Sequence, residues 1–142
     1  MQKKLNKLLN NKQVILFDGF CNFCNSAVLK IIYNDKKNIF LFAPLQSHIG
    51  MQLTNYFTID TKKLDSIILI ESETSFYIKS TAALKIINQF NGFWKLLKIG
   101  WLLPTPLRDF FYSLIARNRY KWFGKKTSCM IPTKEIKSKF IA

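Results

Sequence analysis

The chain has 142 residues, of which 49% are hydrophobic and 15% aromatic, and this is the size and composition of one folded domain. The composition excludes an intrinsically disordered chain, and three cysteines are too few for a secreted disulfide scaffold. The net charge of +14 comes mainly from Lys residues spread along the chain, whereas nucleic-acid readers rely on clustered Arg. We therefore expect a basic protein with no specific nucleic-acid partner.

The sequence offers no targeting or membrane-spanning signal. Residues 1–13 are rich in Lys and Asn and lack the apolar run of a secretory signal, so we expect a flexible N-terminal segment. The most apolar window, residues 93–103, contains two Lys and is followed by Pro104, well short of the ~20 residues that span a bilayer. These observations predict a cytoplasmic protein without a transmembrane segment.

The first half of the chain alternates between predicted strands and helices. Residues 14–17 form a short apolar run typical of a strand, and the turn signal Asp18-Gly19 follows. Residues 39–43 are predicted to form a second strand, and residues 44–56 a helix that begins at Pro44. The helix between the two strands is predicted from apolar residues that share one helical face, at Cys24, Ala27, Val28, Ile31 and Ile32.

The second half begins with a predicted hairpin formed by residues 67–70 and 76–78. A helix capped by Ser80 follows, and residues 94–103 form a short helix or connector. The last helix is capped by Thr105. Its apolar side consists of Leu107, Phe110, Phe111, Leu114 and Ile115.

The chain beyond Asn118 is basic and predicted to be mostly irregular. Arg117, Arg119 and Tyr120 lie where the last helix ends. Positive charge at this end suits the helix dipole, and a basic rim around a thiolate would be an equally physical use of it.

The order of these elements predicts an α/β fold. Strands that alternate with helices favour a mixed sheet with helices on its faces, and no repeat or linker divides residues 1–142. We expect one domain with a helical, basic C-terminal extension over residues 94–142. A CxxC motif at the start of the helix after the first strand is typical of thioredoxin-like folds.

The CxxC motif formed by Cys21 and Cys24 is the strongest chemical signal in the sequence. Its spacing places Cys21 at the first turn of a helix, where unpaired N–H groups and the helix dipole favour a thiolate. A thiolate is the attacking species in disulfide exchange, and Cys24 lies close enough to resolve the mixed disulfide. The pattern favours a thiol-disulfide oxidoreductase with a protein or small-molecule thiol or disulfide as substrate and no organic cofactor.

Asp18 precedes the motif and has two candidate roles. Its carboxylate caps the turn or the helix, or it accepts a proton from Cys24 during exchange. A phosphatase nucleophile is excluded, because that motif requires a second acid two residues on, where this chain has Phe20. The candidate catalytic residues are therefore Asp18, Cys21 and Cys24.

A zinc site is one alternative for the motif, with Cys21, Cys24, Cys129 and His48 as the ligand set. The chain has no second CxxC and no paired histidine, so we expect no metal. We expect instead an exposed helical His48 and a buried, apolar Cys129, with a third redox thiol as the alternative for Cys129.

A binding module with a structural CxxC is the other alternative. In this hypothesis the basic surface and the aromatic C-terminal segment dock a protein, an acidic ligand or a membrane face. The aromatic residues have a helical spacing that favours a place in the core; they are Trp94, Trp101, Tyr120 and Trp122.

A family resemblance extends over nearly the whole chain, from Val14 to Pro132. It is carried by residues 16–24 (LFDGFCNFC), 42–47 (FAPLQS) and 80–84 (STAAL), by Arg108-Asp109 with Tyr112, by residues 115–124 (IARNRYKWFG) and by Cys129. These segments resemble the DCC family of predicted thiol-disulfide oxidoreductases, which is named for its Asp, Cys and Cys.

The resemblance implies a thioredoxin-like fold and a redox function for the CxxC, with Asp18, Cys21 and Cys24 at the core of the site. It specifies no substrate. Two departures from thioredoxins imply a different substrate surface, and the redox potential of thioredoxin does not carry over to this chain. Asp65-Ser66 stand where thioredoxins have a cis-proline before the central strand, and Asn22-Phe23 replace the Gly-Pro of thioredoxin itself.

Overall fold

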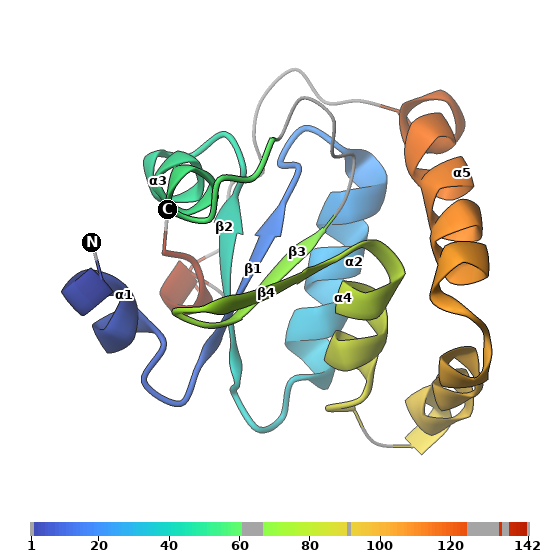
Figure 1. Ribbon diagram of the computed structural model, residues 1–142, viewed down its shortest axis with the longest axis horizontal. Coiled ribbons are helices and arrows are strands. Elements are labelled where there is room, and N and C mark those ends of the chain that lie inside the picture. Colours follow the sequence, from blue (N-terminus) through green and yellow to red (C-terminus); the bar gives the residue numbers. More distant parts are fainter. Residues whose placement is uncertain (1, 61–66, 91, 125–133, 135–136, 142) are drawn as a thin grey trace.

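The computed structural model describes residues 2–60, 67–90, 92–124, 134 and 137–141. These residues form a four-stranded mixed sheet with the strand order β2-β1-β3-β4 (Figure 1). β1 runs parallel to β2 and antiparallel to β3, and β3 pairs with β4 as the predicted hairpin. The strands are β1 (Gln13–Phe17), β2 (Phe40–Pro44), β3 (Ile68–Ser72) and β4 (Ser75–Ile78).

Helices cover both faces of the sheet, which confirms the predicted α/β class (Figure 1). The first face carries α1 (Gln2–Leu8) and α3 (His48–Tyr56). The second face carries α2 (Asn22–Asn34) and α4 (Lys79–Ile87). The CxxC therefore lies where the first strand leads into the first helix of the second face, as the sequence predicts.

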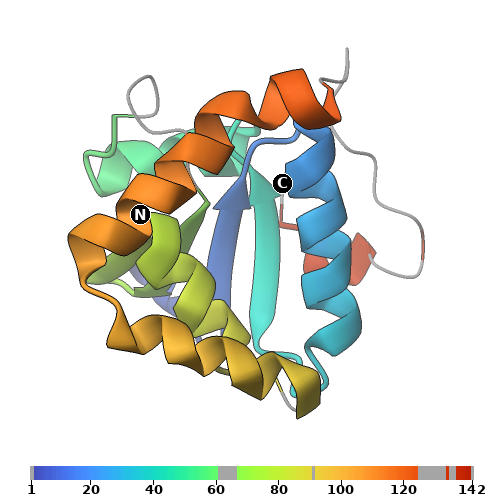
Figure 2. The same ribbon diagram turned by 90° about the vertical axis from the view of Figure 1, so that its right-hand side faces the viewer.

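An outer layer covers the helices of the second face. It consists of a 3₁₀ helix, η1 (Gly92–Leu102), which packs on α4, and the long helix α5 (Thr105–Phe123), which packs on α4 and α2 (Figure 2). This layer is the helical part of the predicted C-terminal extension. A short 3₁₀ helix near the C-terminus, η2 (Lys137–Lys139), lies beside β2.

The central strand β1 is buried on both of its faces. Ile15 and Phe17 belong to the core cluster under α2 and α4, whereas Val14 and Leu16 belong to the cluster under α1 and α3. Side chains alternate between the faces of a strand, so a strand covered on both sides is apolar throughout. The continuous apolar run of residues 14–17 has this cause, and it anchors the loop that follows Phe17.

The prediction of a flexible segment at residues 1–13 does not match the structure of α1. Leu5 is fully buried in the cluster under α1 and α3, and Leu9 packs against the same cluster. The physical reason is the spacing of Leu5, Leu8 and Leu9, which places them on one face of a helix. The Lys and Asn residues between them occupy the solvent side.

Several predicted helix boundaries are shifted by the caps that the chain uses. Pro44 ends β2 rather than starting a helix, and α3 begins at His48 because the Ser47 hydroxyl accepts the backbone N–H of Gly50 at 3.0 Å. α4 begins at Lys79, so Ser80 lies in its first turn and is not its cap.

The last helix is also longer than predicted. α5 begins at Thr105 after Pro104, and it continues to Phe123 instead of becoming irregular beyond Asn118. The extra turns bring Arg119 and Tyr120, on the helix, to Asp18 at the end of β1.

Candidate functional site

Cys21 forms the N-cap of α2, directly after the loop that leaves β1. Its sulfur accepts the backbone N–H of Cys24 at 3.2 Å, and its own N–H donates to the Asp18 carbonyl at 3.3 Å. Cys21 is fully buried, whereas Cys24 is partly buried. The structure therefore confirms that Cys21 sits at the helix N-terminus, where the first N–H groups point at its sulfur.

The two thiols are electrostatically unequal. Burial raises the pKa of the Cys24 thiol well above its ordinary range, and a hydrogen bond to the Cys21 side chain and the nearby Cys21 charge raise it further. The Asp18 charge acts in the same direction, while the Arg119 charge lowers the pKa of Cys24. Cys24 therefore remains a protonated thiol at neutral pH.

Asp18 is a buried carboxylate that accepts hydrogen bonds from four donors. Oδ1 accepts the backbone N–H of Phe20 at 3.0 Å and the Gln46 side-chain amide at 2.8 Å. Oδ2 accepts Arg119 Nη2 at 2.9 Å, in a buried ion pair, and it also accepts the Tyr120 hydroxyl. The carboxylate thus joins the CxxC loop to two distant segments of the chain.

Gln46 reaches Asp18 because β1 and β2 are parallel. The carboxyl ends of parallel neighbours lie at the same edge of the sheet, and the backbone N–H of Leu45 donates to the Phe17 carbonyl there at 2.7 Å. The Gln46 amide then makes two bonds to the CxxC loop, since its Oε1 also accepts the Gly19 N–H at 3.1 Å. Gln46 therefore holds the loop in place from the neighbouring strand.

α5 is tied to the rest of the fold along its length, which sets where its last turns lie. Near its start, Asp109 accepts a hydrogen bond from the Ser80 hydroxyl of α4. One turn later, the Tyr112 hydroxyl accepts the backbone N–H of Ile67 at 3.0 Å. The end of α5 consequently crosses the start of α2, beside the motif (Figure 2).

A pocket of about 640 Å³ opens beside the motif, between α2, α4 and α5. Cys24 lines it, and Cys21 does not. Asp18, Lys30 and Tyr112 supply polar groups, whereas most of the lining is apolar. The apolar residues include Phe17, Ile31, Ile86, Phe90 and Phe123.

His48 is exposed at the start of α3, as predicted. No three His, Cys, Asp or Glu side chains come together as a metal-binding group within the part of the chain that the structure describes. Cys129, considered as a zinc ligand, a redox thiol or a core residue, lies outside that part, and so do Asp65 and Ser66.

The structure places Asp18, Cys21 and Cys24 in one loop and helix start, and side chains that the sequence analysis did not assign to the site hold this loop. Gln46 was available as a signal, since it follows the second predicted strand shortly after its end, and residues after parallel strands share a sheet edge. The sequence analysis explained Arg119 and Tyr120 by their place at the end of the helix, where positive charge suits the helix dipole or forms a basic rim around a thiolate. Their contacts to Asp18 depend on how α5 docks, which no local pattern specifies.

Residues 15–125 match the model of the DCC1-like thiol-disulfide oxidoreductase family. The chain belongs to this family. The match contains all of the site described above, from the end of β1 to the end of α5, and it confirms the resemblance seen in the sequence.

Two relatives show how widely related chains occur. The chain is 45% identical over 129 residues to the uncharacterized protein YuxK of Bacillus subtilis (strain 168), covering 91% of this chain and 93% of the relative. It is 36% identical over 121 residues to the chloroplastic DCC family protein At1g52590 of Arabidopsis thaliana, covering 84% and 70%. No solved structure matches the chain.

Proposed function

We propose that this protein is a thiol-disulfide oxidoreductase in which Cys21 attacks and Cys24 resolves. The observation that carries the proposal is the position of both cysteines at the start of α2, where Cys21 caps the helix and its sulfur accepts the Cys24 N–H. Cys21 thus occupies the position at which the first N–H groups of a helix point at its sulfur, and the raised pKa of Cys24 keeps that group protonated. Membership of the family supports the same chemistry.

The reduced protein would act in two exchange steps. The Cys21 thiolate attacks one sulfur of a substrate disulfide, forming a mixed disulfide and releasing the other substrate sulfur as a thiolate. Cys24 then gives its proton to water or to the substrate thiolate released in the first step. It attacks the Cys21 sulfur, which forms the Cys21–Cys24 disulfide and releases the second substrate thiolate. Two electrons pass from the dithiol to the substrate, and the reverse sequence oxidises a substrate dithiol.

Arg119 and Asp18 would control the second step. Arg119 is the charge that lowers the pKa of Cys24, so it stabilises the Cys24 thiolate when that thiolate forms. Asp18 already accepts two hydrogen bonds on each oxygen, which favours a positioning role over the alternative role of proton acceptor. In this role Asp18 holds the loop and the end of α5 beside the motif.

The pocket indicates the class of substrate. Cys21 is fully buried and Cys24 lines the pocket, so a substrate sulfur would approach from the pocket side, past Cys24. The mainly apolar lining favours a thiol or disulfide carried on an apolar group, such as a hydrophobic peptide segment or an aliphatic or aromatic small molecule. We place the reaction in the cytoplasm, where thiols are kept reduced.

A redox titration tests the proposal. The protein is equilibrated in glutathione buffers of defined potential, and the Cys21–Cys24 disulfide is quantified by differential alkylation and mass spectrometry. We expect a reversible two-electron transition between roughly −120 and −270 mV, the range of known dithiol catalysts. A Cys129→Ser variant is the control and keeps this transition. A chain that forms no Cys21–Cys24 disulfide at any potential would leave the redox proposal without a basis.

Single-cysteine variants assign the roles. Cys24→Ser accumulates a mixed disulfide between Cys21 and a test disulfide, because the resolving thiol is missing, whereas Cys21→Ser accumulates none. The opposite pattern, with trapping only in Cys21→Ser, would make the pocket-facing Cys24 the attacking residue and overturn the assignment.

A further inference from the structure

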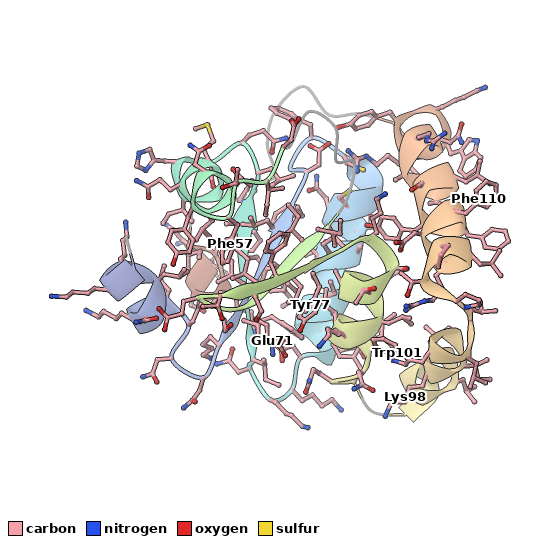
Figure 3. The ribbon with its side chains drawn as sticks, in the orientation of Figure 1. Phe57, Glu71, Tyr77, Lys98, Trp101 and Phe110 are labelled. Atoms are coloured by element: carbon pink, nitrogen blue, oxygen red, sulfur yellow. The ribbon has the colours of Figure 1, made fainter. Side chains whose placement is uncertain are left out.

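The long helix α5 turns its apolar side away from the protein. Phe110 is 62% exposed and Phe111 is 52% exposed. Leu107, Leu114 and Ile115, on the same side, are also exposed. Figure 3 shows Phe110 on the outer edge of α5, pointing away from the sheet. A helix that packs on a core normally buries such a stripe, so this orientation is the reverse of the usual one.

Specific polar contacts hold α5 in this orientation. The side of α5 that faces the protein carries Asp109, bonded to Ser80, and Tyr112, bonded to the backbone of Ile67. It ends with the buried Arg119, which pairs with Asp18. Turning the apolar stripe inward would break all three contacts, including the ion pair of the functional site.

The exposed apolar surface continues onto η1. Leu102 is 84% exposed, and Trp101 and Trp122 are exposed as well, which corrects the expectation that these tryptophans lie in the core. We call this surface the outer face. Its described apolar residues are Leu96, Leu97, Ile99, Trp101, Leu102, Leu103, Leu107, Phe110, Phe111, Leu114, Ile115 and Trp122. A contiguous apolar surface of this extent marks an interaction site.

Positive charge accompanies this surface. Residues 92–124 contain six basic residues and one acidic residue, Asp109, which faces the protein and is bonded to Ser80. Lys98, Arg117 and Lys121 are exposed. Arg117 and Lys121 share a side of α5 with Leu114, which lies three residues before Arg117 and seven residues before Lys121 along the helix. Long basic side chains beside apolar residues keep their charges in the lipid headgroup layer while their stems cover apolar surface.

We propose that the outer face docks the protein on the surface of an anionic lipid bilayer. Helices with Trp, Phe and Leu on one side and Lys and Arg around them lie in the plane of the bilayer interface, and Trp favours the headgroup level. In the part of the chain that the structure describes, no helix has the length and apolar content to cross a bilayer. The face therefore lies on the membrane rather than spanning it.

The charge distribution favours a bilayer over a second copy of the chain. A two-fold dimer would bring the same patch of each copy together, and the exposed Lys98, Arg117 and Lys121 would face the same three residues of the other copy. An anionic bilayer supplies the opposite charge over the whole face.

Vesicle flotation tests the proposal with the full chain. We expect binding to vesicles of phosphatidylglycerol and phosphatidylcholine at about a 1:2 ratio to be at least about tenfold stronger than to phosphatidylcholine alone. High salt weakens this binding because it screens the charges. Tryptophan fluorescence shifts to shorter wavelength on binding, as Trp101 and Trp122 enter the interface.

Paired variants connect the binding to the outer face. Phe110→Ser with Leu114→Ser lowers binding about tenfold or more, without loss of folding, because both side chains are exposed. Tyr33→Ser with Met51→Ser, also at exposed positions but on α2 and α3, is the matched control and binds like the parent. Arg117→Gln with Lys121→Gln weakens binding more than Lys36→Gln with Lys37→Gln, which removes the same charge elsewhere.

Two results would overturn the proposal. In the first, sedimentation shows a stable dimer that the Phe110→Ser, Leu114→Ser variant dissociates, and the outer face is then an interface between copies. In the second, the monomer binds neither kind of vesicle, and the face then serves a protein partner. Because neither result involves Cys21 or Cys24, the redox proposal stands or falls separately.

Discussion

Asp18 and Arg119 are 101 residues apart in the chain, and their side chains form a buried ion pair with an N–O distance of 2.9 Å. Asp18 begins the loop that carries the CxxC, and Arg119 lies in the penultimate turn of α5. The pair therefore connects the CxxC motif to the outer layer of the fold. The pair also helps to fix which side of α5 faces the protein. The exposed apolar face then lies on the opposite side of that helix.

The first prediction concerns the stability that this pair provides. Arg119→Met leaves the Asp18 carboxylate buried without its cation, and loss of one partner of a buried pair costs about 3 kcal/mol in the free energy of unfolding. Arg117→Met is the matched control, because Arg117 is exposed on the same helix, and it changes stability by less than about 0.5 kcal/mol. Urea unfolding measures both, and equal stabilities of the two variants would contradict the prediction.

The second prediction is a pH dependence that originates at Cys24. Its pKa is raised above the ordinary value of 9.0, first by burial and then by its hydrogen bond to Cys21. Above pH 9, therefore, the unfolded chain loses a proton that the folded protein keeps. The contribution of Cys24 to the free energy of unfolding is therefore complete below this pH. As the pH rises above it, this contribution is lost by up to about 1.4 kcal/mol per pH unit.

Urea unfolding of the reduced protein between about pH 7 and pH 10 measures this contribution. The parent chain loses stability over the alkaline part of the range more steeply than Cys24→Ser does. The comparison cancels the contributions of the other ionisable groups that the two proteins share. Parallel pH profiles for the two proteins would show that Cys24 is not the group responsible.

Much of the fold followed from the sequence because local patterns determine it. The apolar run of residues 14–17 predicted β1, the hairpin of β3 and β4 followed from two short runs, and the helical spacing of Val28 and Ile31 predicted α2. The position of Cys21 at a helix start followed from the same patterns, since the motif lies between strand and helix.

The missed features depend on contacts between distant segments. Gln46 and Arg119 hold Asp18 by hydrogen bonds, although both are far from it in the sequence. The spacing of apolar residues along the chain does not predict such contacts. The orientation of α5 is a second case. Its apolar spacing was visible, but which side faces the protein is decided by Asp109 and Tyr112, through their bonds to Ser80 and Ile67.

The third prediction tests whether α1 is part of the folded core. Leu5→Ala removes a fully buried side chain from the cluster under α1 and α3, and we expect a loss of about 2–3 kcal/mol in the free energy of unfolding. Leu102→Ala, the same change at a residue that is 84% exposed, leaves stability unchanged. A flexible segment at residues 1–13 would instead make the Leu5 change as neutral as the Leu102 change.

The fourth prediction concerns the pocket as the substrate site. Ala83 lines it from α4, and Ala83→Leu fills part of its 640 Å³ volume. We compare reduction of the mixed disulfide of glutathione and benzyl thiol with reduction of glutathione disulfide. The preference for the benzyl substrate, expressed as the ratio of kcat/KM values, falls about tenfold in the variant, because a hydrophobic pocket discriminates by the apolar volume it accepts.

The control for this prediction is Ala116→Leu, the same change at a partly buried residue of α5 that does not line the pocket. It leaves the substrate preference as it is in the parent chain. If Ala83→Leu slows both substrates equally, the pocket does not receive the apolar group, and the substrate sulfur reaches Cys21 by another route. If only the benzyl substrate is affected, the apolar lining beside Cys24 selects the substrate and the CxxC supplies the chemistry.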